Sequence, residues 1–178
     1  MAEQRMVAVA RDCPVRRVPT GEAATLPAGE FVTLTQALGG NYTVLWRGNL
    51  WRVDAVDAPC LGLPGLELHF DDPGDGRIHE EQVWQALETI YDPEIPVNIR
   101  ALGLVYRLEV DQERGRVTID MTLTAPGCGM GPVLVGDVER RVGLVPNVKE
   151  VVVNLVFDPP WSRDRMSDEA KLETGLFF

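Results

Sequence analysis

Cys128 is the residue of this sequence best placed to do chemistry. It lies in the stretch LTAPGCGMGP, residues 123–132, between a strand-like pattern and a helical pattern. A loop that leads into a helix N-terminus offers unpaired N–H groups and the positive end of the helix dipole, which favour a thiolate and can bind anions. From the residues alone, a reactive or metal-ligating thiol and an inert turn cysteine both stay open, because free cysteine often packs as a small apolar side chain.

Three glycines surround this thiol: Gly127, Gly129 and Gly131. Their missing side chains permit close approach to the backbone, as in loops that bind phosphate. The stretch contains neither a GK[ST] signature nor a GxGxxG signature, so the pattern does not predict nucleotide binding.

A second candidate loop is acidic. The stretch YDPEIPVN, residues 91–98, carries Asp92 and Glu94 next to two prolines. Carboxylates on a rigid loop can orient a ligand, take a proton or coordinate a metal, although Asp-Pro is also common in ordinary turns. The loop follows the first predicted helix of its domain, and the predicted sheet could bring it near Cys128.

The remaining residues disfavour a hydrolase and a metal cage within one chain. The two histidines, His69 and His79, lie near a predicted linker, and neither belongs to a triad pattern. The three cysteines, Cys13, Cys60 and Cys128, are widely spaced and form no CxxC motif, which argues against a disulfide framework and for a reducing compartment. A metal or an iron–sulfur cluster would then be shared between two chains of a homodimer or with a partner protein.

The composition of the chain limits the classes of partner that it is expected to bind. The chain has 178 residues, of which 45% are hydrophobic, and a formal net charge of −10. Such a charge repels nucleic acid and anionic membranes. The N-terminal stretch lacks a long apolar run, so we expect neither a signal peptide nor a membrane span, and a cytoplasmic location.

The first part of the chain predicts a small β-rich unit. Residues 1–29 hold three prolines and scattered charge, which indicate an extended lead-in. Residues 30–70 alternate like strands, with a hairpin turn near residues 47–49 that uses Gly and Asn for positive φ. Trp46 and Trp51 flank this turn and are expected to pair across it. Residues 71–77, DDPGDGR, have the composition of a linker.

Residues 78–178 predict a two-layer α/β domain with the order α-β-β-α-β and a three-stranded sheet. Its third strand is rich in valine, which suggests a central position. Val135, Val138 and Val142 are expected to form the buried stripe of the second helix. A short C-terminal helix follows, with Ser167 as its N-cap. The predicted elements are a helix over 78–92, strands over 102–110 and 116–124, a helix over 131–143 and a strand over 148–157.

The segment that leads to this last helix contains Trp161, in DPPWSRDRMS. The Trp side chain could clamp the tail onto the domain, which we favour, or face a partner together with Arg163 and Met166.

Three stretches together resemble a known family: YDPEIPVNIRALGLVYRLEV (residues 91–110), MTLTAPGCGMGP (residues 121–132) and VVVNLVFDPPWSRDRMSDEAK (residues 151–171). They are similar to the small α/β domain of iron–sulfur cluster assembly factors of the SufT type. The N-terminal VTLTQALGGNYTV and GNLWRVDAVDA resemble an extra β segment of that type, so that the resemblance covers residues 30–178.

This resemblance implies a non-enzymatic auxiliary factor that helps to assemble or deliver clusters to client apo-proteins, with the assembly machinery as partner. Cys128 would be the family's loop cysteine, binding iron or a cluster transiently, and Asp92 and Glu94 its acidic loop. The alternatives are a thiol-dependent redox protein or enzyme that uses the same cysteine, and a non-catalytic adaptor. The absence of a CxxC pair and of a nearby histidine in the sequence disfavours the thiol enzyme.

Overall fold

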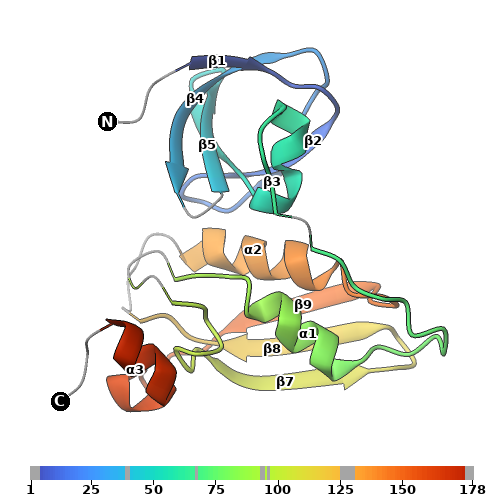
Figure 1. Ribbon diagram of the computed structural model, residues 1–178, viewed down its shortest axis with the longest axis vertical. Coiled ribbons are helices and arrows are strands. Elements are labelled where there is room, and N and C mark those ends of the chain that lie inside the picture. The colour runs from blue at the N-terminus through green and yellow to red at the C-terminus, as the bar shows by residue number, and fades with distance from the viewer. Residues whose placement is uncertain are drawn as a thin grey trace. The chain divides into compact units, whose positions relative to one another are not determined.

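Two units make up the chain, Met1–Leu68 (unit 1) and His69–Phe178 (unit 2). A computed structural model describes residues 5–38, 41–66, 68–92, 95, 97–124 and 131–174 (Figure 1). The division between the units falls just before the stretch that we expected to be a linker, residues 71–77.

Unit 1 is built on one antiparallel sheet with the strand order β1-β4-β5-β6-β2-β3. Its core contains Val15, Leu26, Val44 and Val53, each at most 3% exposed. The elements are β1 (Arg5–Ala8), β2 (Cys13–Arg17), β3 (Ala23–Leu26), β4 (Phe31–Leu38), β5 (Asn41–Trp46), β6 (Asn49–Val53) and the 3-10 helix η1 (Ala55–Leu61). The β-rich character predicted for this part of the chain is confirmed.

The expectation of an extended lead-in over residues 1–29 is wrong, because this segment supplies β1, β2 and β3. Proline did not prevent pairing: Pro14 lies within β2, opposite Thr25 of β3. The strands are held in the sheet because Cys13, Val15 and Leu26 place apolar side chains in the core of unit 1.

The predicted hairpin joins β5 to β6. Trp46 and Trp51 contact each other as predicted, with ring centroids 6.2 Å apart in an edge-to-face arrangement. Positive φ falls on Arg47 and Gly48 rather than on Asn49, which begins β6. A two-residue turn of the type that matches the strand twist needs positive φ at both central positions, which explains the shift.

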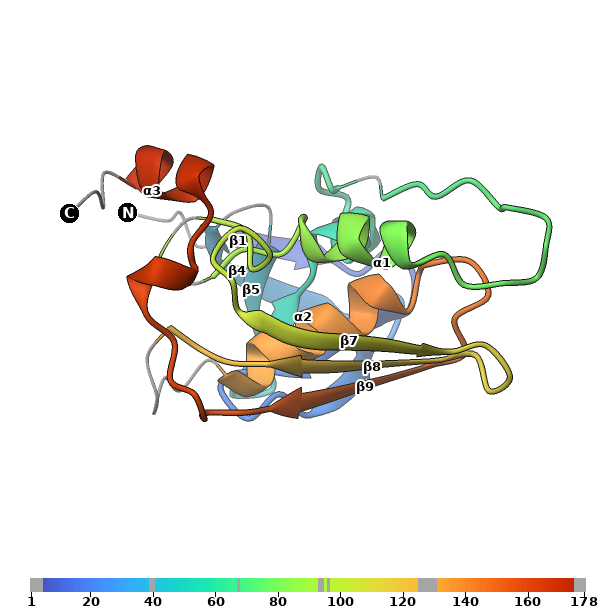
Figure 2. The same cartoon turned by 90° about the horizontal axis from the view of Figure 1, so that it is seen from below.

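Unit 2 is an α/β unit in which two helices cover one face of a three-stranded sheet (Figure 2). β7 and β8 are antiparallel, and β8 and β9 are parallel. The elements are α1 (Glu80–Leu87), β7 (Val105–Asp111), β8 (Arg116–Met121), α2 (Gly131–Val142), β9 (Glu150–Leu155), the 3-10 helix η2 (Arg163–Arg165) and α3 (Asp168–Thr174).

β8 lies within the strand predicted over 116–124 and alternates along its length, since Val117, Ile119 and Met121 are fully buried against the helices. The prediction that the valine-rich strand is central is wrong, because the strand order is β7-β8-β9 and β9 lies at an edge. Its three consecutive valines, residues 151–153, are only half-buried. Valines of this strand pack against α2, and the strand pairs with β8 on one side only. A high valine content therefore does not require a neighbouring strand on both sides.

Both helices of unit 2 differ from prediction in detail. Helix α1 ends at Leu87, not Asp92, and the Thr89 hydroxyl donates to the Ala86 carbonyl at 2.6 Å just beyond that end. In α2, Val135 is half-buried rather than buried. The buried face of α2 instead includes Leu134, Val138 and Val142.

Candidate functional site

The acidic loop after α1 is closed on itself by backbone contacts. An isolated antiparallel bridge joins Tyr91 to Asn98. The Asp92 N–H donates to the Val97 carbonyl at 3.2 Å, and the Ile95 N–H donates to Asp92 Oδ1 at 2.9 Å. Asp92 is only 6% exposed, so its carboxylate acts inside the loop as an acceptor and fixes the loop conformation.

Asp92 also joins this loop to the end of β8. The hydroxyl of Thr124 donates to Asp92 Oδ2 at 3.3 Å, across 32 positions of sequence. Thr124 lies three residues after the last residue of β8 and four residues before Cys128. The contact therefore places the acidic loop against the chain that leads directly to the cysteine.

Several predicted site residues cannot be placed. Cys128, Glu94, Gly127 and Gly129 lie outside the described residues, and their roles stay predictions. Gly131 is described, and it is buried as the first residue of α2.

Gly131 has a packing role in the described structure. A Cβ atom at this position would lie 3.0 Å from Leu123 Cδ1 and 3.7 Å from Leu155 Cδ1. The missing side chain therefore lets the first turn of α2 lie close to the ends of β8 and β9.

A second tie connects α2 to the acidic loop. Arg141, which is 3% exposed near the end of α2, donates through Nη1 to the carbonyl of Thr89. Thr89 lies three residues before Asp92, just past the end of α1. Arg141 thus satisfies a carbonyl at a helix C-terminus, where no intrahelical donor is available.

Sequence reasoning missed Thr124 and Arg141 as site-building residues. Thr124 is the last residue of the strand predicted over 116–124, and Arg141 belongs to the predicted helix over 131–143, where an arginine is usually exposed. The local pattern contains no signal for either contact, because each partner lies on another loop more than 30 residues away.

The tail after β9 is clamped onto unit 2, as we favoured. The Trp161 indole N–H donates to the Leu102 carbonyl at 2.6 Å. The Tyr106 hydroxyl donates to the Pro159 carbonyl at 2.8 Å. Ser167 caps α3, because its hydroxyl accepts from the Ala170 N–H at 3.1 Å.

The alternative of a partner surface at Trp161, Arg163 and Met166 is corrected in part. Met166 is 4% exposed and belongs to the core of unit 2. Trp161 is half-buried, and of the three residues only Arg163 is exposed. An apolar side chain in this tail is held inward because burying it in the core is favourable.

The histidines do not form a catalytic arrangement. His69 contacts Asp71 at 3.2 Å and is 84% exposed. His79 contacts Asp75 at 2.8 Å. The Arg77 backbone N–H and the His79 ring both lower the pKa of Asp75. Within the described ranges, no group of three or more His, Cys, Asp or Glu residues could hold a metal ion.

Cys13 and Cys60 form a separate pair in the core of unit 1. Both are fully buried and free. The Cys60 thiol lies 3.9 Å from the Asp12 carbonyl, next to Cys13 in sequence. Burial and contact with Cys60 raise the pKa of the Cys13 thiol far above its ordinary value, so Cys13 is a protonated core residue rather than a nucleophile. No helix of the described chain is long and apolar enough to cross a membrane.

Unit 2 thus defines a class of protein: a small two-layer α/β domain in which an acidic loop is joined to the segment that follows the central strand β8. Residues 80–154 match the family described as iron–sulfur cluster assembly protein. A maturation auxiliary factor for Fe-S proteins from Porphyromonas gingivalis is 48% identical over 97 residues, which cover 54% of this chain and 91% of that protein. The chain belongs to this family of iron–sulfur cluster assembly proteins.

Two further relatives are of the same kind. The Fe-S protein maturation auxiliary factor SufT of Staphylococcus aureus is 44% identical over 87 residues, covering 49% of this chain and 98% of that protein. YitW of Bacillus subtilis, named in the same way, is 42% identical over 97 residues, covering 54% of this chain and 94% of that protein. The predicted resemblance to SufT-type assembly proteins is confirmed.

Two solved structures are also similar to this chain. A domain of unknown function, DUF59, from Bacillus anthracis is 42% identical, with a TM-score of 0.52, covering 55% of this chain and 92% of that one. A conserved hypothetical protein from Thermotoga maritima is 34% identical, with a TM-score of 0.50, covering 57% of this chain and 98% of that one. Each of these two solved structures aligns with little more than half of this chain, which is about the share of the chain that a single unit makes up.

The N-terminal part of the predicted resemblance finds no support in these relatives. The 87 aligned residues account for 98% of the S. aureus SufT, so that protein is too short to contain both units. The family match begins at residue 80, inside unit 2. Unit 1 is therefore an addition to the family domain as these relatives have it.

Proposed function

We propose that this chain is an auxiliary factor in the maturation of iron–sulfur proteins, and that it acts through the thiolate of Cys128. Iron or a cluster is the cargo, which passes to client apo-proteins with the help of the assembly machinery. The chain works without catalytic turnover, in agreement with relatives that are named auxiliary factors.

The observation that carries this proposal is the contact of Thr124 with Asp92 inside the segment that matches the family. It joins the acidic loop to the segment that leads to the cysteine, which supports our assignment of the two candidate motifs to one site. Asp92 serves as a positioning residue, because both oxygens of its buried carboxylate are engaged by groups of this chain. Glu94, two residues further, is the carboxylate that we assign to the cargo.

One chain supplies too few ligands to hold a cluster by itself. Clusters are commonly held by four cysteine thiolates, whereas this chain offers Cys128 and two buried cysteines in unit 1. The other ligands must come from a second subunit or from the protein that gives or receives the cargo. Such incomplete ligation suits a carrier, because a cluster that is weakly held is readily transferred.

A complementation experiment tests the role of the thiol. Cells that lack the protein are supplied with the wild-type chain, with Cys128→Ser or with Cys60→Ala, and the activity of an iron–sulfur enzyme is measured. Cys128→Ser should fold normally and lose at least about tenfold of the support for enzyme activity, because serine is a poor ligand for iron. Cys60→Ala, which removes a thiol from unit 1, should keep that support. Normal enzyme maturation with Cys128→Ser would reject the cysteine mechanism.

Anaerobic addition of iron and sulfide tests the cargo itself. The wild-type chain should develop the visible absorption of a cluster, and sizing should show whether the coloured species is a dimer. Cys128→Ser should stay colourless. Equal colour in both proteins would place the cluster elsewhere, and colour in neither would favour a chaperone or adaptor that stores no cluster.

Thr124→Val tests the contact between the two loops. Loss of one hydrogen bond to a buried carboxylate should lower the free energy of unfolding by about 1–3 kcal/mol and reduce enzyme maturation in the same cells. Thr118→Val, at a half-exposed position of β8, is the matched control and should leave maturation unchanged. Full support of maturation by Thr124→Val would show that the loops act independently.

A further inference from the structure

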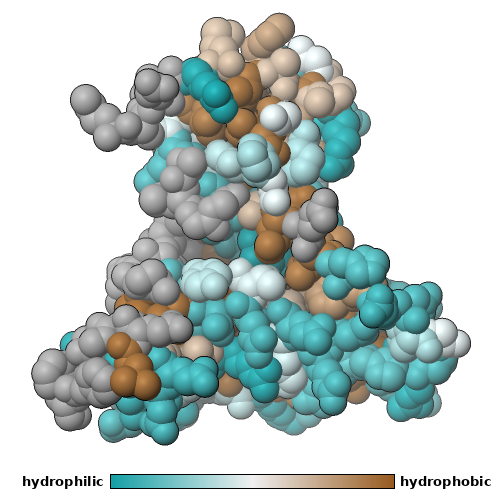
Figure 3. All heavy atoms as spheres, viewed as in Figure 1, coloured by the Kyte–Doolittle hydropathy of each residue, from teal (hydrophilic) through white to brown (hydrophobic). Residues whose placement is uncertain are grey.

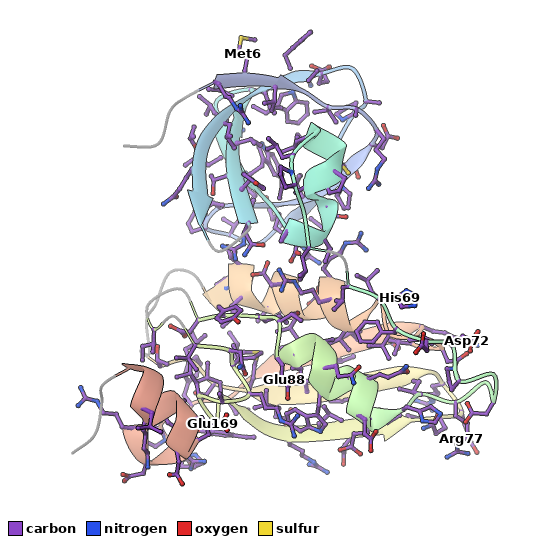
Figure 4. All side chains as sticks on the ribbon, viewed as in Figure 1. Met6, His69, Asp72, Arg77, Glu88 and Glu169 are labelled. Carbon is purple, nitrogen blue, oxygen red and sulfur yellow. The ribbon has the colours of Figure 1, made fainter. Side chains whose placement is uncertain are left out.

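Unit 1 exposes apolar side chains beside an open strand. Met6 and Ala8 share one face of β1, and Ala8 lies directly opposite Phe31 of β4. Met6 is 69% exposed and Phe31 63% exposed. Figure 4 shows Met6 projecting away from the ribbon of unit 1. We call Met6, Ala8 and Phe31 the β1 patch.

Within the described sheet, the outward N–H and C=O groups of Met6 and Ala8 in β1 face no other strand, and two residues beyond Ala8 the Ala10 N–H donates to the Cys60 carbonyl of η1 at 2.6 Å. β1 stands at the end of the strand order and has only β4 as a neighbour in the described sheet. The Val9 N–H donates to the Glu30 carbonyl, and the Val9 carbonyl accepts from the Gly29 N–H, both at 2.8 Å. Because strand residues alternate in direction, Val7 also points toward β4, and the N–H and C=O groups of Met6 and Ala8 point outward. Such an edge is a template for another strand.

A second copy of β1 is complementary to this edge. Antiparallel pairing about a two-fold axis at Val7 sets Met6 of one chain opposite Ala8 of the other, and each such pair exchanges both of its N–H···O bonds. The longest exposed apolar side chain of the strand then meets the smallest. Since Phe31 lies directly opposite Ala8 on its own chain, the Met6 thioether of the other chain can reach the Phe31 ring, a favourable contact.

The charge of the chain permits this pairing at unit 1. Residues 1–68 hold six basic and seven acidic side chains, whereas residues 69–178 hold eleven basic and twenty acidic ones. In the viewed face of Figure 3, unit 2 is largely hydrophilic, and apolar residues gather on unit 1. The one charge on β1, Arg5, would lie opposite Val9 of the other chain rather than opposite its own copy. Repulsion between two acidic chains is therefore weaker at unit 1 than at unit 2.

We propose that this protein forms a homodimer in which the β1 strands of two unit 1 domains pair antiparallel about Val7. The interface consists of the outward backbone groups of Met6 and Ala8 and of the apolar contact between Met6 and Phe31 of the other chain. The inference concerns a unit that the family match does not include and does not depend on the role of Cys128.

Sedimentation of the full chain over a range of micromolar concentrations tests the interface. The wild type should show a dimer, and Met6→Glu should raise the dimer dissociation constant by about tenfold or more, because it sets a charge against Ala8 and Phe31. Leu50→Glu is the matched control: Leu50 is 40% exposed on the same face of the sheet, but β4 and β5 separate its strand from β1. It should leave the dimer intact.

A cross-link tests the register. Val7→Cys, in a Cys128→Ser background, places two thiols opposite each other at a non-hydrogen-bonded pair, a separation that a disulfide can bridge. Mild oxidation with oxidised glutathione should form the covalent dimer, and Leu50→Cys in the same background should not. A wild type that stays monomeric, a Met6→Glu variant that dimerises like wild type, or equal cross-linking through Leu50→Cys would each overturn the proposal. Circular dichroism of each variant confirms that it is folded.

Discussion

At the scale of single residues, one carboxylate organises the candidate site. Asp92 is buried, and its two oxygens accept from the Ile95 N–H and the Thr124 hydroxyl. A carboxylate satisfied by local donors is held in one orientation and stabilises the loop that contains it. Of the three cysteines, Cys13 and Cys60 lie in the apolar core of unit 1, and Cys128 lies outside the described residues.

The burial of Cys13 predicts a pH dependence of stability. Burial raises the pKa of its thiol in the folded chain far above the value of about 9.0 expected for an exposed thiol. Below that value the Cys13 thiol is protonated in both the folded and the unfolded chain, so its ionisation does not lower the free energy of unfolding. As the pH rises above it, only the unfolded chain loses the proton, so the free energy of unfolding should fall by up to about 1.4 kcal/mol per pH unit.

Denaturant unfolding of the full chain between neutral and alkaline pH measures this fall. Cys13→Val removes the ionisable group and should flatten the dependence. A wild type and a Cys13→Val variant with the same alkaline slope would contradict the prediction, since another group would then be responsible.

At the scale of elements, the tail after β9 is held by a close backbone approach at Gly103. Gly103 has φ of +71°, and a Cβ atom there would lie 2.3 Å from the Arg165 carbonyl oxygen. The same tail is fixed by Trp161, by the buried Met166 and by the Ser167 N–H, which donates to the Ala101 carbonyl at 2.7 Å. The tail is thus part of the packed unit, because its contacts reach the chain between the acidic loop and β7.

Gly103→Ala should therefore destabilise unit 2 through two effects, the left-handed backbone and the clash with Arg165. Gly74→Ala is the matched control: Gly74 has φ of +73° but open space around it. We expect about 1 kcal/mol for Gly74→Ala and about 1–3 kcal/mol more for Gly103→Ala. Chemical denaturation measures both, and equal losses would show that the tail moves aside without cost.

At the scale of the whole molecule, the family domain and the added unit are separate structural bodies. Each has its own hydrophobic core, one around Ile119 and Leu102 in unit 2 and one around Val44 and Leu26 in unit 1. The relatives that cover nearly their full length with fewer than 100 aligned residues exist without a counterpart of unit 1. A core of its own is what lets a domain fold alone.

A fragment of residues 69–178 should therefore fold by itself. Its circular dichroism and its dispersed amide spectrum should show a folded α/β domain that unfolds cooperatively, with a free energy close to that of the same unit in the full chain. In parallel, the full chain should show separate unfolding of its two units. A fragment that is unfolded, or that melts at a much lower temperature than unit 2 in the full chain, would contradict the independence of the units.

Much of unit 2 could be predicted because its patterns are local. The strict alternation of Val117, Ile119 and Met121 defines the buried face of a strand, and the glycine-rich stretch before Pro132 defines the start of a helix. Prolines in the first segment were misleading, since a residue such as Pro14 is compatible with a strand when its neighbours bury apolar side chains. Pairing with another strand is what decides between an extended lead-in and a sheet.

The sequence by itself determined the elements of unit 2, the family and the identity of Cys128, Asp92 and Glu94 as candidates, because each rests on residue types at short spacing. Only the tertiary structure decided that Thr124 meets Asp92, that β9 lies at an edge, that Met166 faces the core and that β1 to β3 complete a sheet. These outcomes depend on contacts between residues far apart in the chain, and such contacts form wherever the burial of apolar side chains and the satisfaction of polar groups are best met together.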